Sequence, residues 1–200
     1  ASSGISEEDL GGISELFTGH SAILNDGKIT MIHNPERRGV GKIYTPFDVT
    51  EYMCKHSVKK LISRVNSVDE LFSLRVLDPA VGSGAFCSQF IRCLWKSASR
   101  KWKLEDEKAF KIRVCEDMIH ACDIDQQALD LARIVLWISS GCPSEELKLN
   151  FSLCDSLYSG SCTDIKDWSG HTGLEIVNGY DLVIGNPPYV MIKAEDYTKF

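Results

Sequence analysis

From residue 74 onward, short apolar segments alternate with segments in which apolar residues recur at the helical period. Alternation of this kind is typical of a parallel sheet whose strands are joined by crossover helices. The pattern therefore predicts an α/β fold. We expect four strands, at residues 74–77, 119–124, 149–154 and 180–184.

Helical segments are expected between the first three of these strands. One covers about residues 85–97, and a charged, solvated helix follows at 101–113. Asp125 is suited to cap the next helix, which Gly141 and Pro143 end. Its apolar face is expected to comprise Ala128, Leu129, Ala132, Val135, Leu136 and Ile138. The long polar segment 156–179 is expected to be a loop.

A polar, mostly helical lead precedes the α/β pattern, and we place the domain boundary between residues 43 and 44. The lead, 1–43, is expected to contain a helix at 6–17, an irregular stretch or hairpin at 21–34 and a basic loop at 37–42. The following domain spans 44–200. It begins with a helix capped by Thr45, with Pro46 in its first turn and its end near Arg64. Its buried face is expected to comprise Val49, Tyr52, Met53, Val58, Leu61 and Ile62.

The composition is that of a globular domain, with 44% hydrophobic and 25% charged residues among 200. This excludes disordered, collagen-like and coiled-coil proteins. Apolar runs are far shorter than the roughly 18 to 20 residues that span a bilayer. The acidic N-terminal segment lacks the basic and then apolar order of a signal peptide. We therefore expect a cytoplasmic protein without membrane association.

The eight cysteines include no Cys-x-x-Cys pair, and without an export signal we expect them to be reduced. No His or Cys spacing fits a metal site, so no metal is expected. The formal net charge of −6 argues against this segment alone holding a phosphate backbone. Basic surface for nucleic acid would have to come from elsewhere.

The segment after the first expected strand carries a candidate ligand-binding turn, Asp-Pro-Ala-Val-Gly-Ser-Gly. Gly82 and Gly84 allow a sharp turn and close approach of a ligand, and Asp78 places a carboxylate beside it. A dinucleotide-binding fingerprint would have a third glycine where this chain has Cys87, which disfavours NAD. Alternatively, the glycines form a turn without a ligand.

The second and third expected strands also end in carboxylates. Asp123 follows the second strand, where nucleotide-binding sheets accept hydrogen bonds from ribose hydroxyls. Asp155 follows the third and is suited to accept from an adenine amino group. Asp125 is expected to be a helix cap, and this alternative remains open for Asp123. Together with Asp78, these residues predict a pocket for an adenosine with a cationic or amino-bearing tail.

The fourth expected strand ends in Gly-Asn-Pro-Pro-Tyr, the most specific short segment of the chain. The carbonyls of Asn186 and Pro187 are suited to accept both hydrogens of an NH2 group, and Tyr189 offers a face for stacking. Pro187 and Pro188 remove backbone donors and restrict φ. These properties suit an amine conjugated to a π-system, although a plain turn is the alternative.

Three motifs, in this order, resemble the N6-adenine DNA methyltransferases of restriction-modification systems. They are YTPFDVTEYM at 44–53, DPAVGSGAF at 78–86 and NPPY at 186–189. The stretch 128–137 resembles enzymes of this class that fuse methyltransferase and endonuclease. The resemblance covers about residues 37–192. Val81 departs from the Cys that the family often has there.

The resemblance implies S-adenosylmethionine as cofactor and a Rossmann-like methyltransferase fold with strand order 3-2-1-4. It implies that Thr45 and Asp78 bind the methionine part, Asp123 the ribose and Asp155 the adenine. Ala80, Gly82, Gly84 and Ile124 complete the implied cofactor site. Asn186, Pro187, Pro188 and Tyr189 form the implied catalytic clamp on an adenine flipped out of double-stranded DNA.

The family's sheet continues beyond its fourth strand, so the chain is expected to be a fragment that is inactive alone. DNA would be bound through the absent C-terminal part, and an endonuclease domain or subunit is compatible with the resemblance. Two alternatives stay open. One is a protein-glutamine methyltransferase, which also uses Asn-Pro-Pro-Tyr, and the other is a noncatalytic module that binds S-adenosylmethionine.

Overall fold

The computed structural model describes residues 20–25, 28–33, 45–142, 147–156 and 179–187. The chain divides into two compact units, one of residues 1–45 with 187–200 and one of residues 46–186. The expected boundary at 43/44 stays a prediction. No helix within the described ranges is long and apolar enough to cross a membrane.

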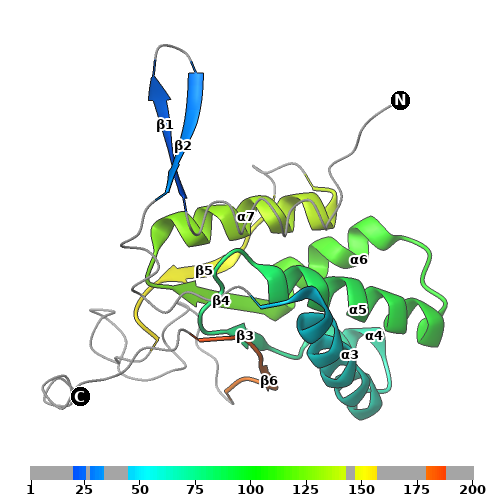
Figure 1. Cartoon of the computed structure of the whole chain (residues 1–200). Coiled ribbons are helices and arrows are strands. Elements are labelled where there is room, and N and C mark those ends of the chain that lie inside the picture. Colours follow the sequence, from blue (N-terminus) through cyan, green and yellow to red (C-terminus); the bar gives the residue numbers. More distant parts are fainter. Residues whose placement is uncertain (1–19, 26–27, 34–44, 143–146, 157–178, 188–200) are drawn as a thin grey trace, which may run out of the picture. The chain divides into compact units, whose positions relative to one another are not determined.

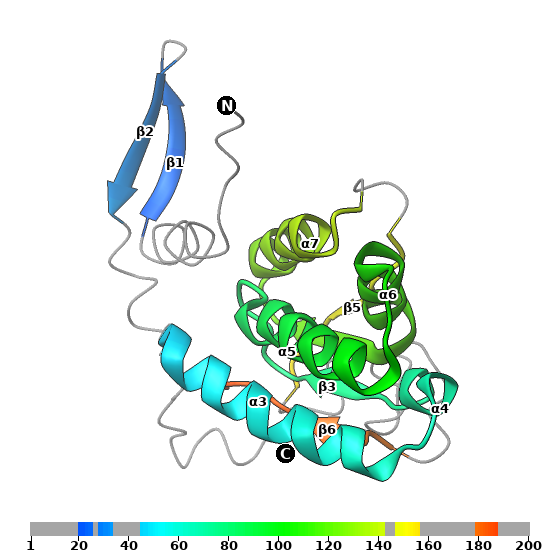
Figure 2. The same ribbon diagram turned by 90° about the vertical axis from the view of Figure 1, so that its right-hand side faces the viewer.

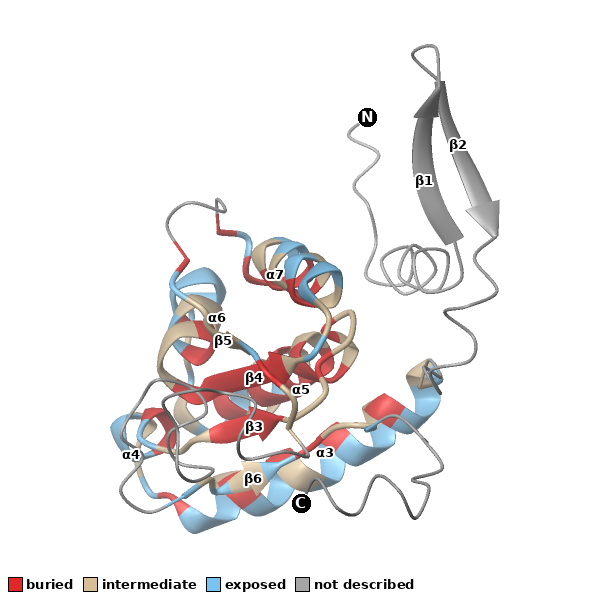
Figure 3. Ribbon diagram, turned by 90° about the vertical axis from the view of Figure 1, so that its left-hand side faces the viewer, coloured by how far each residue is buried: buried red, intermediate tan, exposed pale blue. Residues whose placement is uncertain are grey.

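A parallel sheet of four strands forms the centre of the second unit (Figure 1). Its strands are β3 (Val76–Asp78), β4 (Ile119–Asp123), β5 (Asn150–Leu153) and β6 (Leu182–Val183). Their order is β5-β4-β3-β6, which confirms the expected α/β fold and the order 3-2-1-4. The central strands β3 and β4 are almost wholly buried, whereas β5 and β6 at the two edges are more exposed (Figure 3).

β3 and β6 both begin later than the apolar pattern suggests. The backbone N–H of Arg75 donates to the Asp181 carboxylate (2.8 Å), and the N–H of Asp181 donates to the Arg75 carbonyl (2.8 Å). The Asp181 side chain thus takes the place of a backbone acceptor just before the first paired residues of β3 and β6. Regular pairing then starts at Val76 and Leu182.

Three long helices pack against the sheet on one side, with α5 between α3 and α7 (Figure 2). They are α3 (Phe47–Arg64), α5 (Ala85–Trp102) and α7 (Gln126–Ser140). Ile119 and Ala121 of β4 belong to the core beneath these helices. His120 and Cys122 are also buried, but strand alternation places them on the opposite face.

The N-terminal part of α3 differs from the expectation. Pro46, rather than Thr45, is the N-cap, and no side chain caps the helix. Val49, Tyr52 and Met53 are exposed (44%, 64% and 36%), so their assignment to the buried face was wrong. The buried side chains are Thr50, Cys54, Val58 and Leu61. Their spacing of three to four residues forms a stripe facing α5, and it includes a polar residue that an apolar pattern omits.

The charged segment expected as a single helix at 101–113 is divided. α5 continues to Trp102 and ends at Lys103, which has a positive φ of 54°. α6 (Glu107–Arg113) then begins after Asp106, whose carboxylate accepts from the Ala109 N–H at 2.9 Å. A five-residue π-helix, η1 (Val114–Met118), leads into β4.

A short helix before β3, α4 (Val68–Phe72), was not expected. The Ser67 hydroxyl accepts from the Glu70 N–H at 3.1 Å, and the Glu70 carboxylate accepts from the Asn66 N–H at 2.7 Å. This arrangement resembles a capping box, and Ser-x-x-Glu in the sequence could have indicated it.

The expectation for α7 is confirmed at both ends. The Asp125 carboxylate accepts from the Gln127 N–H at 2.9 Å, and Gly141 ends the helix in the left-handed region (φ 67°). Most of the predicted apolar face is buried, but Ile138 is 42% exposed and was wrongly included. Pro143 lies outside the described residues.

The described part of the first unit is an antiparallel hairpin of β1 (His20–Asn25) and β2 (Lys28–His33). This confirms the hairpin alternative for residues 21–34. The expected helix at 6–17, the basic loop at 37–42 and most of the loop at 156–179 lie outside the described residues.

Candidate functional site at the carboxyl edge of the sheet

The carboxyl ends of the four parallel strands lie at one edge of the sheet, where open α/β sheets bind ligands. Asp78 and Asp123 are the last residues of β3 and β4, and Asp155 lies two residues beyond β5. The Cys154 N–H donates to the Asp123 carbonyl at 3.0 Å, which continues the β4–β5 pairing up to Asp155. Three carboxylate residues thus follow three adjacent strands.

Asp78 is the most deeply buried of these carboxylates, with 2% exposure. Its Oδ1 accepts from the Ala80 N–H at 3.1 Å, whereas the buried Oδ2 has no hydrogen-bond partner. Burial raises the pKa of Asp78 to about 7; the Ala80 N–H opposes this shift, and the nearby charge of Asp123 adds to it. An uncompensated buried carboxylate of this kind is suited to meet a cation.

The glycine turn connects β3 to α5 and is anchored to β4. The Val81 N–H donates to the Cys122 carbonyl at 2.9 Å, and the Gly84 N–H donates to the Val81 carbonyl at 2.8 Å. Gly82 and Gly84 both have positive φ, 53° and 82°, which favours glycine. Gly82 and Gly84 differ, however, in how closely other atoms surround them.

A Cβ at Gly82 would meet no heavy atom within 4 Å, so this position faces open space. A Cβ at Gly84 would lie 3.2 Å from the Ala132 Cα in α7. Gly84 therefore allows the start of α5 to pack closely against α7. Of the two glycines, Gly82 is the one beside which a ligand has room.

The two carboxylate oxygens of Asp123 join the glycine turn to the start of α7. Oδ2 accepts from the Gly82 N–H at 2.9 Å, and Oδ1 accepts from the Asp125 N–H at 3.0 Å. Asp125 caps α7 and Asp123 does not, which separates the two roles left open above. A carboxylate oxygen has more than one acceptor site, so Asp123 retains capacity for hydroxyl donors. Ile124, which follows it, is 66% exposed.

β6 brings Gly185 against Asp78. The Ile184 N–H donates to the Leu77 carbonyl at 2.9 Å. A Cβ at Gly185 would lie 2.5 Å from Asp78 Oδ1 and 3.2 Å from Pro79 Cδ, so only glycine fits without displacement. Asn186, directly after it, is half-buried. Gly185 was missed as a site residue, although its place before Asn-Pro-Pro offered a signal.

The remaining expected site residues are not placed relative to this edge. Thr45 and Pro187 are assigned to the other unit, and Pro188 and Tyr189 lie outside the described residues. The structure thus brings together Asp78, Ala80, Gly82, Asp123 and the segment that leads to Asn186. No group of His, Cys, Asp and Glu within the described ranges forms a metal site.

Comparisons with known proteins relate this chain to restriction-modification enzymes. Residues 117–200 match the model of the Eco57I restriction-modification methylase family. A putative type II restriction enzyme and methyltransferase of Methanocaldococcus jannaschii is 23% identical over 151 residues, covering 56% of this chain and 13% of that protein.

Among solved structures, the DrdV–DNA complex matches with a TM-score of 0.59 and 19% identity, over 96% of this chain and 18% of DrdV. A nuclease-deletion mutant of the Type ISP restriction-modification enzyme LlaGI, with a DNA substrate mimic, matches with a TM-score of 0.44, 19% identity and coverage of 57% and 10%. The chain spans less than a fifth of the length of each of these proteins. The resemblance of the chain to the methyltransferases of restriction-modification systems is confirmed.

Proposed function

We propose that this chain is the cofactor-binding and catalytic part of a DNA methyltransferase that transfers a methyl group from S-adenosylmethionine to the N6 amine of adenine. The observation that carries the proposal is the contact between Gly185 and Asp78. It sets the segment leading to Asn186 directly beside the glycine turn. Donor and acceptor sites of a methyl transfer have to adjoin in this way.

The residues present fit S-adenosylmethionine. Asp78 Oδ2 is a buried acceptor without a partner, suited to the amino group of the methionine tail. Gly82 leaves open space beside the turn for the ligand backbone. Asp123 is fixed by two backbone N–H groups and is suited to accept from ribose hydroxyls, with Asp155 beyond β5 suited to the adenine amine. Ala80, Ile124 and Thr45 are further proposed contacts.

When bound, the cofactor would supply an activated methyl group on a sulfonium. The N–CH3 bond forms as the S–CH3 bond breaks, which leaves a neutral thioether, and the methylated amine releases one proton to solvent, so neither a metal nor a strong base is required. The contribution of the chain is alignment and polarisation of the acceptor amine. The carbonyls of Asn186 and Pro187 accept hydrogens of the adenine NH2 group and localise its lone pair. Tyr189 stacks on the flipped base, and Pro187 and Pro188 stiffen the segment.

DNA as the substrate is supported by the similarity to restriction-modification enzymes, one of which, DrdV, is described in complex with DNA. We propose double-stranded DNA as the partner, bound largely by parts of the protein outside this chain, and a restriction endonuclease activity in the same system. The cytoplasm is the proposed compartment.

Transfer of labelled methyl groups tests the proposal. The full-length protein is incubated with labelled S-adenosylmethionine and either unmethylated duplex DNA or a release-factor protein that carries a glutamine acceptor. Labelled N6-methyladenine in digested DNA is the expected product. Label on protein glutamine would support the alternative methyltransferase, and cofactor binding without transfer to either substrate would support a noncatalytic module.

A further inference from the structure

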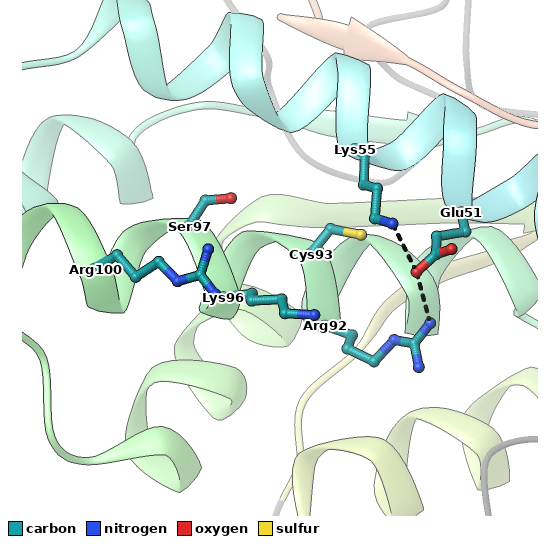
Figure 4. A pocket seen from close by; sticks show the side chains of 7 residues that line it. All are labelled: Glu51, Lys55, Arg92, Cys93, Lys96, Ser97 and Arg100. Atoms are coloured by element: carbon teal, nitrogen blue, oxygen red, sulfur yellow. Dashed lines mark ion pairs between the residues drawn. The ribbon is translucent and has the colours of Figure 1, made fainter.

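A groove of about 300 Å³ lies between α3 and α5, away from the glycine turn. Figure 4 shows that Glu51 and Lys55 reach into it from α3, opposite a row of side chains from α5. Its lining residues are Glu51, Lys55, Arg92, Cys93, Lys96, Ser97 and Arg100. Four of these seven are cationic and one is acidic.

The single carboxylate is shared between two of the cations. Glu51 Oε1 lies 3.1 Å from Lys55 Nζ and 3.6 Å from a guanidinium nitrogen of Arg92. Lys96 and Arg100 are exposed and take part in no ion pair with any described residue. α5 contains no acidic residue along its whole length. The groove therefore keeps an excess of positive charge.

The side chain of Cys93 is buried beneath these groups and adds no negative charge. Burial raises the pKa of the Cys93 thiol; nearby Arg92, Lys55 and Lys96 oppose the shift, and Glu51 adds to it. A neutral thiol does not repel an anion. The negative net charge of the whole chain thus conceals a locally positive surface.

The cations of α5 are arranged as a row. Arg92, Lys96 and Arg100 recur every four residues, which separates them by about 6 Å per step and spans about 12 Å along the helix. Lys101, by contrast, is used in packing, since its Nζ donates to the carbonyls of Ile62 and Val65. A row of charges with this length suits a chain of phosphates better than a single anion.

The row lies on the helix that begins at the glycine turn, and its residues lie progressively farther from that turn. α5 starts directly after Gly84, so Arg92 lies about 12 Å and Arg100 about 24 Å along the helix from the glycine turn. One helical turn of DNA is about 34 Å. The row therefore lies within the length of one helical turn of DNA from the glycine turn.

We propose that the α3–α5 groove binds the phosphodiester backbone of DNA beside the methylation target, an inference that rests on the proposed function. Lys96 and Arg100 make the phosphate contacts. Glu51 limits the affinity because its single negative charge, shared between Lys55 and Arg92, offsets part of the positive charge of the groove.

Salt-dependent binding of a fluorescent duplex to the full-length protein tests this proposal. Each neutralised phosphate contributes about 0.9 to the slope of log K against log salt. Lys96→Gln combined with Arg100→Gln should therefore make this negative slope shallower by about 1.8 and weaken binding about 5- to 30-fold near 0.1 M salt. The control pair, Lys60→Gln with Lys108→Gln, removes the same charge from exposed positions that do not line the groove.

Glu51→Gln provides a change in the opposite direction. It removes the carboxylate that pairs with Lys55 and Arg92, which makes the groove more positive, so the variant should bind the duplex severalfold more tightly than wild type. A groove variant that keeps the slope and affinity of the control pair would overturn the proposal, as would a Glu51→Gln variant with unchanged affinity. Thermal unfolding verifies that each variant is folded.

The outcome for the groove is distinct from the outcome for the proposed function. Methyl transfer by the wild-type protein tests the latter alone. Wild-type methylation of adenine together with an unaltered salt slope in the Lys96 and Arg100 variant would reject only the groove. A changed slope without any methylation would reject the proposed reaction and retain a site for DNA phosphates.

Discussion

Gly185 lies so close to Asp78 that a Cβ at Gly185 would stand 2.5 Å from Asp78 Oδ1. The contact joins the two most distinctive motifs of the chain, which are separated by more than a hundred residues in sequence. It arises because β6 pairs directly with β3, so both strands deliver their next residues to the same edge. The buried carboxylate and the Asn186 segment therefore form one structural unit.

The first prediction concerns this contact. Gly185→Ala should destabilise the protein by about 1 to 3 kcal/mol, the usual range for overpacking a well-filled site. Urea unfolding measures the effect. The cost should fall in an Asp78→Ala background, where the clashing oxygen is absent. An equal cost in both backgrounds would show that the two residues are not coupled.

The second prediction concerns pH. In the free protein the pKa of Asp78 is about 7, whereas a cationic ligand favours the ionised form. The affinity for S-adenosylmethionine should therefore rise between pH 5.5 and 7, by up to about tenfold per pH unit, and then level off. Calorimetric titration across this range provides the measurement. Asp78→Asn should bind more weakly and lose this dependence, and a wild-type affinity that is flat with pH would contradict the assignment.

The same carboxyl predicts the opposite trend for stability without cofactor. The pKa of Asp78 in the folded protein lies above the ordinary value of an aspartate carboxyl, so the folded state binds the proton more tightly than the unfolded chain does. The contribution of Asp78 to stability is full below about pH 4 and is lost as the pH rises to about 7. Asp78→Asn should remove this part of the pH dependence of the unfolding free energy. An Asp78→Asn profile parallel to that of wild type would show that another group is responsible.

The third prediction separates Asp123 from Asp125. Asp123→Ala should weaken S-adenosylmethionine binding by about 1 to 3 kcal/mol, because ribose hydroxyls and two backbone N–H groups lose their acceptor. Asp125→Ala is the matched control. It removes the cap of α7, which should cost about 0.5 to 2 kcal/mol of stability while the affinity for the cofactor stays close to wild type. Equal losses of affinity in both variants would mean that Asp123 acts only through the turn.

The ends of α7 and the positions of Asp78 and Asp123 were predictable from the sequence, because buried strands and helix caps are local signals. The strand order is not a local signal and was expected from the family resemblance. Two features were not predictable from the sequence. Gly84 faces α7 rather than open space, and this depends on how closely Ala132 approaches from another helix. The exposed side chains of α3 were assigned to its buried face because its apolar residues are distributed around the helix, and the packing partner α5 decides which of them are covered.

The α3–α5 groove also depends on tertiary structure. Arg92, Lys96 and Arg100 share one face of a helix in the sequence pattern, but Glu51 and Lys55 come from a segment about forty residues earlier. The negative net charge of the chain gave no indication of this positive groove, because none of the acidic residues lies on α5.

The last prediction concerns the chemistry and is tested in the full-length protein. Asn186→Ala should leave the affinity for S-adenosylmethionine nearly intact, because the proposed role of Asn186 is to contact the acceptor adenine and not the cofactor. It should lower methyl transfer by roughly 10² or more, the usual scale for removing one preorganised polar group that acts on the reacting atom.

Tyr189→Ala is the companion variant, and its main effect should be weaker capture of the flipped adenine, since base–aromatic stacking is worth about 1 to 3 kcal/mol. Single-turnover rates with saturating cofactor, measured over a range of DNA concentrations, separate the two effects. Asn186→Ala should lower the maximal rate, and Tyr189→Ala should chiefly raise the DNA concentration that gives half of it. Wild-type turnover in Asn186→Ala would remove the polarising role of the amide, and with it the main reason to assign the acceptor as an amine conjugated to a π-system.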